Sequence, residues 1–295
     1  MSPRVSIGVP VYNGERYLGA TLDSLLAQTF GDFELIVCDN ASTDGTEAIA
    51  RACAARDARV RYVRHERNLG PPRNYNHAFD LSCGEYFRWF PSDDLAAPES
   101  VARCVEVLDR EPSVVLAYPK TTLIDEDGRV IRDYEDRLHL QSPCPSERFA
   151  QLLRDMVLCN AQYGLMRAAV LRRIGPLGLY VGSDNVLLAE LSLYGTFWEI
   201  PKRLFFRRMH PAASSSMSAA ERQRFYDPSA KGRVAMRQWR LLWELGRAAQ
   251  RAPVDAAQRI RLALCVLRQA RWSRHVLAQE VWSAVRARFV QSGWA

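Results

Sequence analysis

The chain has 295 residues, of which 48% are hydrophobic and 25% charged, so its composition is that of an ordinary globular protein. No stretch approaches the ~18 uninterrupted apolar residues of a membrane-spanning helix, and the first residues lack the apolar core and cleavage site of a signal peptide. Seven cysteines form no C-x-x-C pair. This pattern argues against a zinc site or a disulfide framework, and it favours reduced thiols in a cytoplasmic protein.

Strands and helices alternate over the first 125 residues. Runs of β-branched and apolar residues predict strands over 4–12, 33–40, 60–65, 85–90 and 113–125. Apolar residues at helical spacing, together with cap residues, predict helices over 14–29, 42–56, 71–81 and 99–112. This alternation predicts an α/β fold, a mostly parallel sheet with helices on both faces. Farther along, the pattern is mostly helical over 146–174, strand-like over 197–210 and helical again over 219–295.

Acidic side chains follow three of the predicted strands. Glu15 comes after the first strand, Asp39 after the second, and the pair Asp93 and Asp94 after the fourth. In a parallel sheet these ends meet at one edge, where ligands bind. Adjacent carboxylates raise each other's pKa unless a positive charge compensates, and their hard oxygens suit Mg²⁺ or Mn²⁺. Solvated turn residues remain the alternative interpretation of the pair.

Neither of the two common glycine-rich phosphate loops occurs in the sequence, so a bound diphosphate would be neutralised by a metal ion and by arginine. A divalent cation of this kind commonly bridges a carboxylate and the phosphates of a nucleotide. The acids at the sheet edge therefore favour nucleotide-sugar chemistry, in which a metal stabilises the departing nucleoside diphosphate.

Four stretches in series resemble the inverting family 2 glycosyltransferases of the GT-A fold. They read VSIGVPVYNGERYLGATLDSLLAQT, FELIVCDNASTDGT, RNLGPPRNYNHAF and GEYFRWFPSDD. The resemblance covers residues 4–125 strongly and 126–216 more loosely. It implies a GT-A (Rossmann-like) domain over 1–216, with a donor half over about 1–125 and an acceptor half over about 126–216. A basic helical extension over 217–295 follows.

The resemblance also implies where a nucleotide sugar binds. The "P-x-Y-N" turn and the acid after it line the nucleotide pocket in similar proteins, and the acid after the second strand meets the nucleoside. The residues implied to bind the nucleotide are Pro10, Tyr12, Asn13, Glu15, Asp39, Asn68, Arg73 and Asp93. Asp44 is expected to cap the following helix. Three places depart from the family pattern: Asn40 stands where a second Asp is usual, Pro91 replaces the first acid of the D-x-D-D form, and Asn74-Tyr75-Asn76 stands where Ala-Arg-Asn is usual, with Arg73 close enough to substitute.

The metal ligands and the catalytic base follow from the same resemblance. Asp94, with His210, is implied to bind Mg²⁺ or Mn²⁺; the missing first acid weakens this site or makes its occupancy depend on substrate. Inversion by a single displacement needs a carboxylate opposite the leaving group to take the proton of the acceptor. Asp184, in SDNVLLAEL, is the implied base. The alternative is that Asp184 only stabilises a helix N-terminus through the helix dipole.

The resemblance thus implies a metal-dependent inverting glycosyltransferase with a nucleoside-diphosphate sugar as donor, UDP being favoured. The acceptor is a hydroxyl of a glycan, a lipid-linked glycan or a small molecule, and no nucleic acid is expected as a partner. Two alternatives stay open. A sugar-phosphate nucleotidyltransferase would need a glycine-rich basic loop near the first strand, which is absent. A non-catalytic sugar-nucleotide-binding scaffold protein is kept open by Pro91 and Asn40.

The net charge of +7 is unevenly distributed along the chain. Residues 1–200 hold 21 Lys and Arg against 28 Asp and Glu, whereas residues 201–295 hold 19 against 5. Five of the seven tryptophans also lie in this basic segment. Basic amphipathic helices of this composition lie on anionic membrane surfaces, here at the cytoplasmic face. They are equally expected of a helical subdomain that packs on the core.

Overall fold

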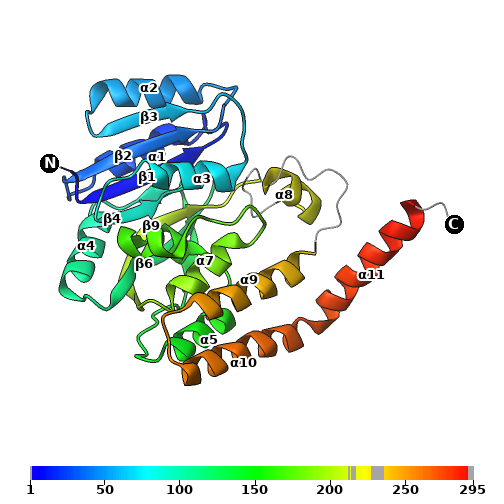
Figure 1. Cartoon of the computed structure of the whole chain (residues 1–295). Helices are drawn as coiled ribbons and strands as arrows, with labels where there is room; N and C mark the ends of the chain where they lie inside the picture. The colour runs from blue at the N-terminus through cyan, green and yellow to red at the C-terminus, as the bar shows by residue number, and fades with distance from the viewer. Residues whose placement is uncertain (1, 212, 214–216, 227–235, 292–295) are drawn as a thin grey trace.

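The computed structural model describes residues 2–211, 213, 217–226 and 236–291, and within them one nine-stranded sheet runs through the molecule between layers of helices (Figure 1). The predicted domain boundary at residue 216 and the last tryptophan, Trp294, lie outside these residues. The strands lie in the order β3-β2-β1-β4-β8-β6-β9-β5, and β7 pairs with β6.

The predicted strands and helices are present with small shifts at their ends. The strands are β1 (Val5–Val11), β2 (Phe33–Asp39), β3 (Val60–Arg64), β4 (Tyr86–Trp89), β5 (Leu95–Ala96), β6 (Val114–Ile124), β7 (Val130–Tyr134), β8 (Leu165–Arg167) and β9 (Thr196–Arg208). The helices are α1 (Leu18–Leu26), α2 (Thr46–Arg56), α3 (Pro71–Asp80), α4 (Ser100–Arg110), α5 (Pro145–Asp155), η1 (Asn160–Tyr163), α6 (Ala168–Ile174), α7 (Ser183–Leu191), α8 (Ala219–Tyr226), α9 (Arg237–Arg251), α10 (Ala256–Trp272) and α11 (Arg274–Gln291).

The first four strands in sequence form a parallel sheet. β1 pairs with β2 on one side and β4 on the other, so that Gly8 lies between Ile36 and Trp89, and β2 pairs with β3. β1 and β4 are buried along their whole length, as expected of parallel strands covered on both faces. Because the four strands point the same way, the loops that follow them meet at one edge of the sheet.

The second half of the sheet is mixed. β8 pairs antiparallel with both β4 and β6, β9 runs parallel to β6, and β5 pairs antiparallel with β9. The segment over 146–174 was expected to be mostly helical, and β8 interrupts it. A strand of three residues is too short to show a period of two in the sequence.

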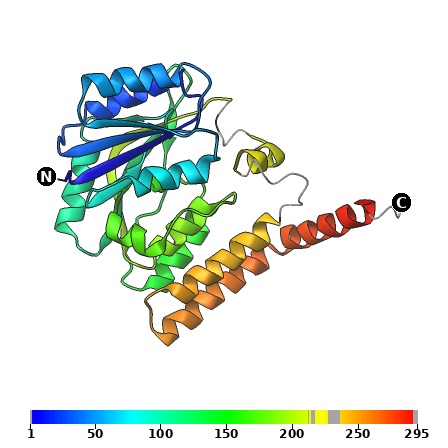
Figure 2. The ribbon, with the colours of Figure 1, turned by 45° about the horizontal axis from the view of Figure 1, so that its top comes forward.

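The helical extension is packed onto the core. One hydrophobic cluster joins α1, α2 and α4 to the sheet, and another joins α5, α6 and α7. Leu245 of α9 and Leu262 of α10 are buried in this second cluster. Figure 2 shows α9 and α10 side by side and α11 projecting beyond them. Within the described residues, no helix has both the length and the apolar character needed to cross a bilayer.

Candidate active site

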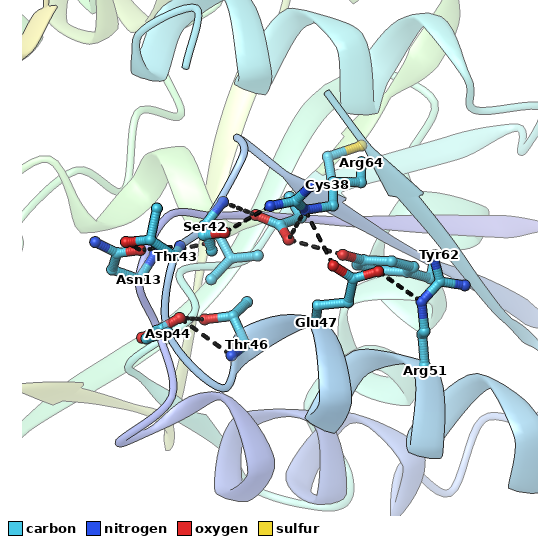
Figure 3. A network of polar contacts seen from close by, with 12 residues as sticks. Asn13, Cys38, Ser42, Thr43, Asp44, Thr46, Glu47, Arg51, Tyr62 and Arg64 are labelled. Atoms are coloured by element: carbon cyan, nitrogen blue, oxygen red, sulfur yellow. Dashed lines mark hydrogen bonds and ion pairs between the residues drawn. The ribbon is translucent and has the colours of Figure 1, made fainter. Parts of the chain in front are cut away.

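The carboxyl edge of β1, β2 and β3 carries a connected network of polar contacts (Figure 3). Asp39, the last residue of β2, is fully buried. Its Oδ1 accepts a hydrogen bond from the Ser42 amide at 2.8 Å, and its Oδ2 accepts one from the Tyr62 hydroxyl at 2.7 Å. The Arg64 guanidinium lies 3.4 Å from Oδ2. Each carboxylate oxygen can accept more than one hydrogen bond, so Asp39 is fixed in place and still has acceptor capacity for a ligand.

The loop after β1 is tied to the loop after β2. Asn13 has a φ of 52°, in the left-handed region that Asn tolerates better than most residues. Its amide donates to Ser42 Oγ and its Oδ1 accepts from the Thr43 amide, both at 2.9 Å. Glu15 Oε2 accepts from the Gly45 amide, also at 2.9 Å. Two of the implied nucleotide-binding residues therefore fix the relative position of the two loops.

Two residues of these loops have clear structural roles. Asp44 Oδ1 accepts hydrogen bonds from the amide and the hydroxyl of Thr46, the first residue of α2. The N-cap residue of α2 is Gly45, so Asp44 supports the start of the helix from one position before the expected cap. Asn40 donates from Nδ2 to Asn68 Oδ1 and accepts at Oδ1 from the Leu69 amide, both at 2.8 Å. An aspartate has no N–H group and could make only the second bond. The departure from the family pattern at Asn40 is thus explained by the loop that it holds.

The other implied nucleotide residues differ in exposure. Pro10 is buried within β1, whereas Tyr12 is 41% exposed beyond its end. Arg73, in the first turn of α3, is exposed and donates a long hydrogen bond of 3.4 Å to the Leu69 carbonyl. Tyr12 and Arg73 are therefore exposed, as are Asn13, Glu15 and Asn68 of the same set.

The acidic pair after β4 is held from two sides. Asp94 is 3% exposed, its Oδ1 accepts from the Arg208 amide at 2.7 Å, and its carbonyl accepts from the Thr21 hydroxyl at 2.9 Å. Burial, followed by the charge of Asp93, raises the pKa of Asp94 well above its usual value, and the charges of Arg207 and Arg208 oppose this rise. The positive charge that the sequence led us to expect beside the two acids comes from β9.

His210 lies beside the first acid of the pair. Its Nε2 is 2.9 Å from Asp93 Oδ2, and its ring centroid is 4.9 Å from that of Tyr17. The Asp93 side chain is 31% exposed. The resemblance grouped His210 with Asp94, and the structure adds that the direct contact of this imidazole is with Asp93.

The two arginines of β9 have different surroundings. Arg208 donates from Nε to the Asp93 carbonyl and from Nη1 to the Glu126 carbonyl, both at 2.8 Å, and its guanidinium lies over the Tyr17 ring. It holds the acidic pair against the β6–β7 hairpin. Arg207 donates instead to Asn160 Oδ1 at 2.6 Å.

The donor atoms of the pair and of His210 suit a divalent cation. Carboxylate oxygens are preferred by Mg²⁺ and Mn²⁺, and an imidazole nitrogen is acceptable to Mn²⁺. In the part of the chain that the structure describes, no three His, Cys, Asp or Glu side chains are grouped so that they could hold a metal ion by themselves. These residues therefore fit a cation that takes its remaining ligands from a diphosphate and water.

The implied base lies at the start of α7. Asp184 Oδ1 accepts from the Asn185 amide at 3.0 Å, and burial raises the pKa of its carboxyl. Its charge in turn contributes, after burial, to the raised pKa of the Cys159 thiol and of the Tyr226 hydroxyl. Asp184 thus lies within short electrostatic range of η1 and of α8.

Three tyrosines connect this carboxylate with the acidic pair. The pKa of Tyr75 is raised by burial and then by the charges of Tyr226, Asp93 and Asp94, and Tyr163 likewise lies near Tyr75 and Asp94. We call Tyr75, Tyr163 and Tyr226 the phenol cluster. Asp94 lies near Tyr75 and Tyr163, and Asp184 lies near Tyr226.

Two polar residues of the acceptor side belong to no motif. Asp136 is 3% exposed, and its Oδ2 accepts from the Thr121 hydroxyl at 3.0 Å. Burial raises its pKa to about 7. Among the described residues its Oδ1 and Nδ2 of Asn160 have no partner within hydrogen-bond distance, although the Asn160 side chain lies close enough to oppose the rise in the pKa of Asp136. The other amide atom of Asn160 accepts the bond from Arg207. Sequence reasoning did not find Asp136 or Asn160, because neither follows a predicted parallel strand.

A mostly parallel half-sheet with acids at its carboxyl edge, joined to a mixed half-sheet, agrees with the GT-A fold that the resemblance implies. The sequence model of Glycosyl transferase family 2 matches residues 6–175. The chain belongs to this family, which confirms the resemblance read from its four stretches.

Curated relatives agree with the assignment. The chain is 34% identical over 129 residues to chondroitin synthase of Escherichia coli, a match of 44% of this chain and 19% of that protein. It is 32% identical over 127 residues to the putative glycosyltransferase EpsE of Bacillus subtilis, or 43% of this chain and 46% of that one. The chain therefore spans less than half the length of either relative.

Solved structures share the fold. S. aureus TarS 1–349 in complex with UDP-GlcNAc superimposes with a TM-score of 0.68 at 19% identity, over 92% of this chain and 72% of that one. The mannosyltransferase PcManGT of Pyrobaculum calidifontis, in complex with GDP-Man and Mn²⁺, superimposes with a TM-score of 0.54 at 16% identity, over 100% of this chain and 88% of that one. At such identities the likeness establishes the GT-A fold, while substrate and mechanism have to be argued from the site.

Proposed function

We propose that this glycosyltransferase is metal-dependent and inverting, with a UDP-sugar as the favoured donor. The observation that carries the proposal is that two carboxylates, the buried Asp94 and the partly buried Asp184, both lie near the phenol cluster. One lies at the edge where parallel strands end, and the other lies in the first turn of a helix. A donor with its pyrophosphate at Asp94 would present its sugar toward Asp184.

The donor edge is suited to bind a nucleotide without rearrangement. Asp39, Asn13 and Glu15 are already held by backbone amides of the neighbouring loop. A ligand that meets side chains fixed in this way loses less free energy to ordering them. We assign the nucleoside to this edge, with the exposed Tyr12 near the base and Arg73 near the phosphates. The complex of TarS with UDP-GlcNAc supports uridine, and that of PcManGT with GDP-Man keeps guanosine as the second choice.

A Mg²⁺ or Mn²⁺ ion is proposed at Asp94, with Asp93 and His210 beside it. When bound, such an ion stabilises the charge that develops on the departing nucleoside diphosphate. The protein prepares the position by directing the Arg208 amide at one oxygen of Asp94 and by placing His210 2.9 Å from Asp93. The presence of Mn²⁺ in PcManGT supports the choice of metal.

Asp184 is proposed to take the proton of the acceptor hydroxyl. Burial raises the pKa of its carboxyl, which strengthens the ionised form as a base. Attack from the side of Asp184, opposite the leaving group, inverts the anomeric carbon in a single displacement. The acceptor is proposed to be a glycan, a lipid-linked glycan or a small molecule.

The scaffold alternative has lost one of its two arguments, because Asn40 is required by the loop that it holds. A nucleotidyltransferase is disfavoured by the family to which the chain belongs. We also propose a cytoplasmic location, since all seven cysteines are free and Cys83 is exposed.

The proposal is tested by calorimetric titration of UDP and GDP with and without Mn²⁺, followed by transfer assays over a panel of nucleotide sugars. We expect metal-dependent binding of UDP and a product whose anomeric configuration, read by NMR, is opposite to that of the donor. Retention of configuration would overturn the single displacement. Nucleotide binding without turnover of any donor would favour the non-catalytic alternative.

A further inference from the structure

The outer faces of α10 and α11 carry an unusual concentration of exposed apolar side chains. We call this set the apolar stripe; its members are 40% to 64% exposed and comprise Ile260, Leu264, Leu267, Trp272, Val281, Trp282 and Val285. On α10 the spacing of four and three residues places the aliphatic members on one face of the helix. Trp239 of α9 joins the α11 members around an apolar groove, and Arg274 borders both this groove and the hollow beside Trp272. The stripe is therefore continuous across the junction of the two helices.

The charges around the stripe have one sign. Exposed arginines flank it along both helices, and they are Arg259, Arg261, Arg268, Arg271, Arg274 and Arg286. The sequence over 256–286 contains one acidic residue, Glu280. Its carboxylate accepts hydrogen bonds from the amides of Gln238 and Trp239 at the start of α9, at 2.8 and 3.3 Å. Glu280 is thus turned toward α9, and over these residues the stripe has no acidic neighbour on its outer side.

The apolar stripe and the arginines around it together indicate which kind of surface can cover this face. A second copy packed on the same face would bring the arginines of both chains together, and like charges across an interface are strongly unfavourable. A partner must instead supply negative charge at the rim and an apolar interior at the centre. The headgroup and acyl boundary of an anionic bilayer has this arrangement, with Trp and Arg at the level of the headgroups.

We propose that α10 and α11 dock peripherally on an anionic lipid bilayer through the apolar stripe. The arginines contact the lipid phosphates while Leu264, Leu267 and Trp282 enter the acyl boundary. Arg268 already lies over the Trp272 ring, 4.6 Å from its centroid, so that a cation and an indole are presented together. This docking requires neither donor nor metal, and it can be measured apart from the transferase activity.

The test is co-sedimentation of the full chain with vesicles of phosphatidylcholine alone or mixed with phosphatidylglycerol. We expect at least about tenfold stronger binding to the anionic vesicles, decreasing as salt is raised. The variant Arg268→Glu/Arg271→Glu should lose at least about tenfold in binding. The matched control Arg172→Glu/Arg173→Glu, on exposed residues of α6, makes the same change in net charge and should lose less than about twofold.

A second variant separates insertion from attraction by charge. Brominated lipids should quench the tryptophan fluorescence of the protein, and Trp272→Phe/Trp282→Phe should remove most of this quenching. Equal losses of vesicle binding in Arg268→Glu/Arg271→Glu and in Arg172→Glu/Arg173→Glu would show a general effect of net charge and overturn the proposal. Absence of vesicle binding, together with a dimer in light scattering that Trp282→Ala dissociates, would assign the stripe to a second copy instead.

Discussion

Asp39 on the donor side and Asp136 on the acceptor side are both buried aspartates close to the end of a strand, but their surroundings differ. Both carboxylate oxygens of Asp39 accept hydrogen bonds, from a backbone amide and from a tyrosine. Asp136 has one bonded oxygen and one for which the described residues give no hydrogen bond, and burial raises its pKa to about 7. On the donor side both oxygens of the carboxylate are held by internal contacts, whereas the acceptor side retains buried polar atoms for which the described residues supply no hydrogen-bond partner.

This difference indicates how the two halves are used. A buried polar atom without a partner costs roughly 1–3 kcal/mol, so it persists where structure or function requires it. The unsatisfied atoms of Asp136 and Asn160 lie near Arg207, which is also close to Asp94. We interpret the donor side as preformed for one class of nucleotide and the acceptor side as completed by its ligand.

The largest effect is expected from Asp184→Asn. If the acceptor side performs the proton transfer, kcat should fall about 10²- to 10⁴-fold, because the amide cannot act as a base. The dissociation constant of UDP with Mn²⁺ should stay unchanged, which calorimetry checks. The control Asp80→Asn, at the exposed end of α3, should retain wild-type kcat. A wild-type kcat in Asp184→Asn would show that another residue acts as the base.

Asp94→Asn should lower transfer about 10²- to 10³-fold, the range for removal of one charge-stabilising group. Unlike the previous variant, it should also weaken the Mn²⁺-dependent part of UDP binding. The Arg208 amide can still bond to the new side-chain oxygen, so the fold should be retained, which circular dichroism verifies. If UDP binding depended on Mn²⁺ equally in Asp94→Asn and in the wild type, Asp94 would not be a ligand of the metal.

The pH dependence of stability tests the surroundings of Asp136. Asp136 keeps its proton in the native state up to about pH 7, whereas in the unfolded chain it ionises near its ordinary value of 3.8. Between these values the native state binds more protons, so the free energy of unfolding falls as pH rises, by up to about 4 kcal/mol. Asp136→Asn should remove this decrease, as urea denaturation at about pH 5 and about pH 8 would show. Equal slopes in both proteins would contradict it.

Arg251→Ala tests the contact between the extension and the core. It leaves the buried Glu190 without its two hydrogen bonds of 3.0 and 2.6 Å. We expect a loss of about 1–3 kcal/mol in the free energy of unfolding. Arg154→Ala, which breaks an exposed pair with Asp155, should cost less than about 1 kcal/mol. Similar losses in the two variants would mean that the contact contributes no more than a surface pair.

The smallest effect is expected from Arg73→Ala. Its exposed guanidinium would meet the donor phosphates through solvent-screened contacts, each contributing about 1 kcal/mol or less. KM for the donor should rise about fivefold or less, with kcat unchanged. A much larger rise would place Arg73 in a buried contact with the diphosphate.

Most of the donor side could be predicted from the sequence because buried parallel strands consist of continuous runs of apolar residues. The predicted strands over 4–12 and 33–40 correspond to β1 and β2, and the acids that follow them meet at one edge as expected. The first helix was predicted from residue 14 but begins at Leu18. The segment before it is a turn in which the Tyr17 amide donates to the Gly14 carbonyl.

The acceptor side could be predicted only in part. Asp184 was proposed from the pattern around it, and it lies in the first turn of α7 as the sequence led us to expect. Arg207 and Asn160 are 47 positions apart, and no local signal connects them. Asp136 follows the short β7 hairpin, where an acid is ordinarily a solvated turn residue. Such residues acquire their surroundings from tertiary packing, which composition and periodicity do not describe.

The ion pair between Glu190 and Arg251 has a consequence for the proposed base. Glu190 and Asp184 lie on the same helix, α7, about 9 Å apart along its axis. A displacement of α9 would therefore be passed to α7 and to the carboxylate that is proposed as the base. If Asp184 has that role, the helices that follow the sheet help to set the geometry of catalysis, and the orientation of the body on any surface that those helices touch also fixes the direction from which an acceptor arrives.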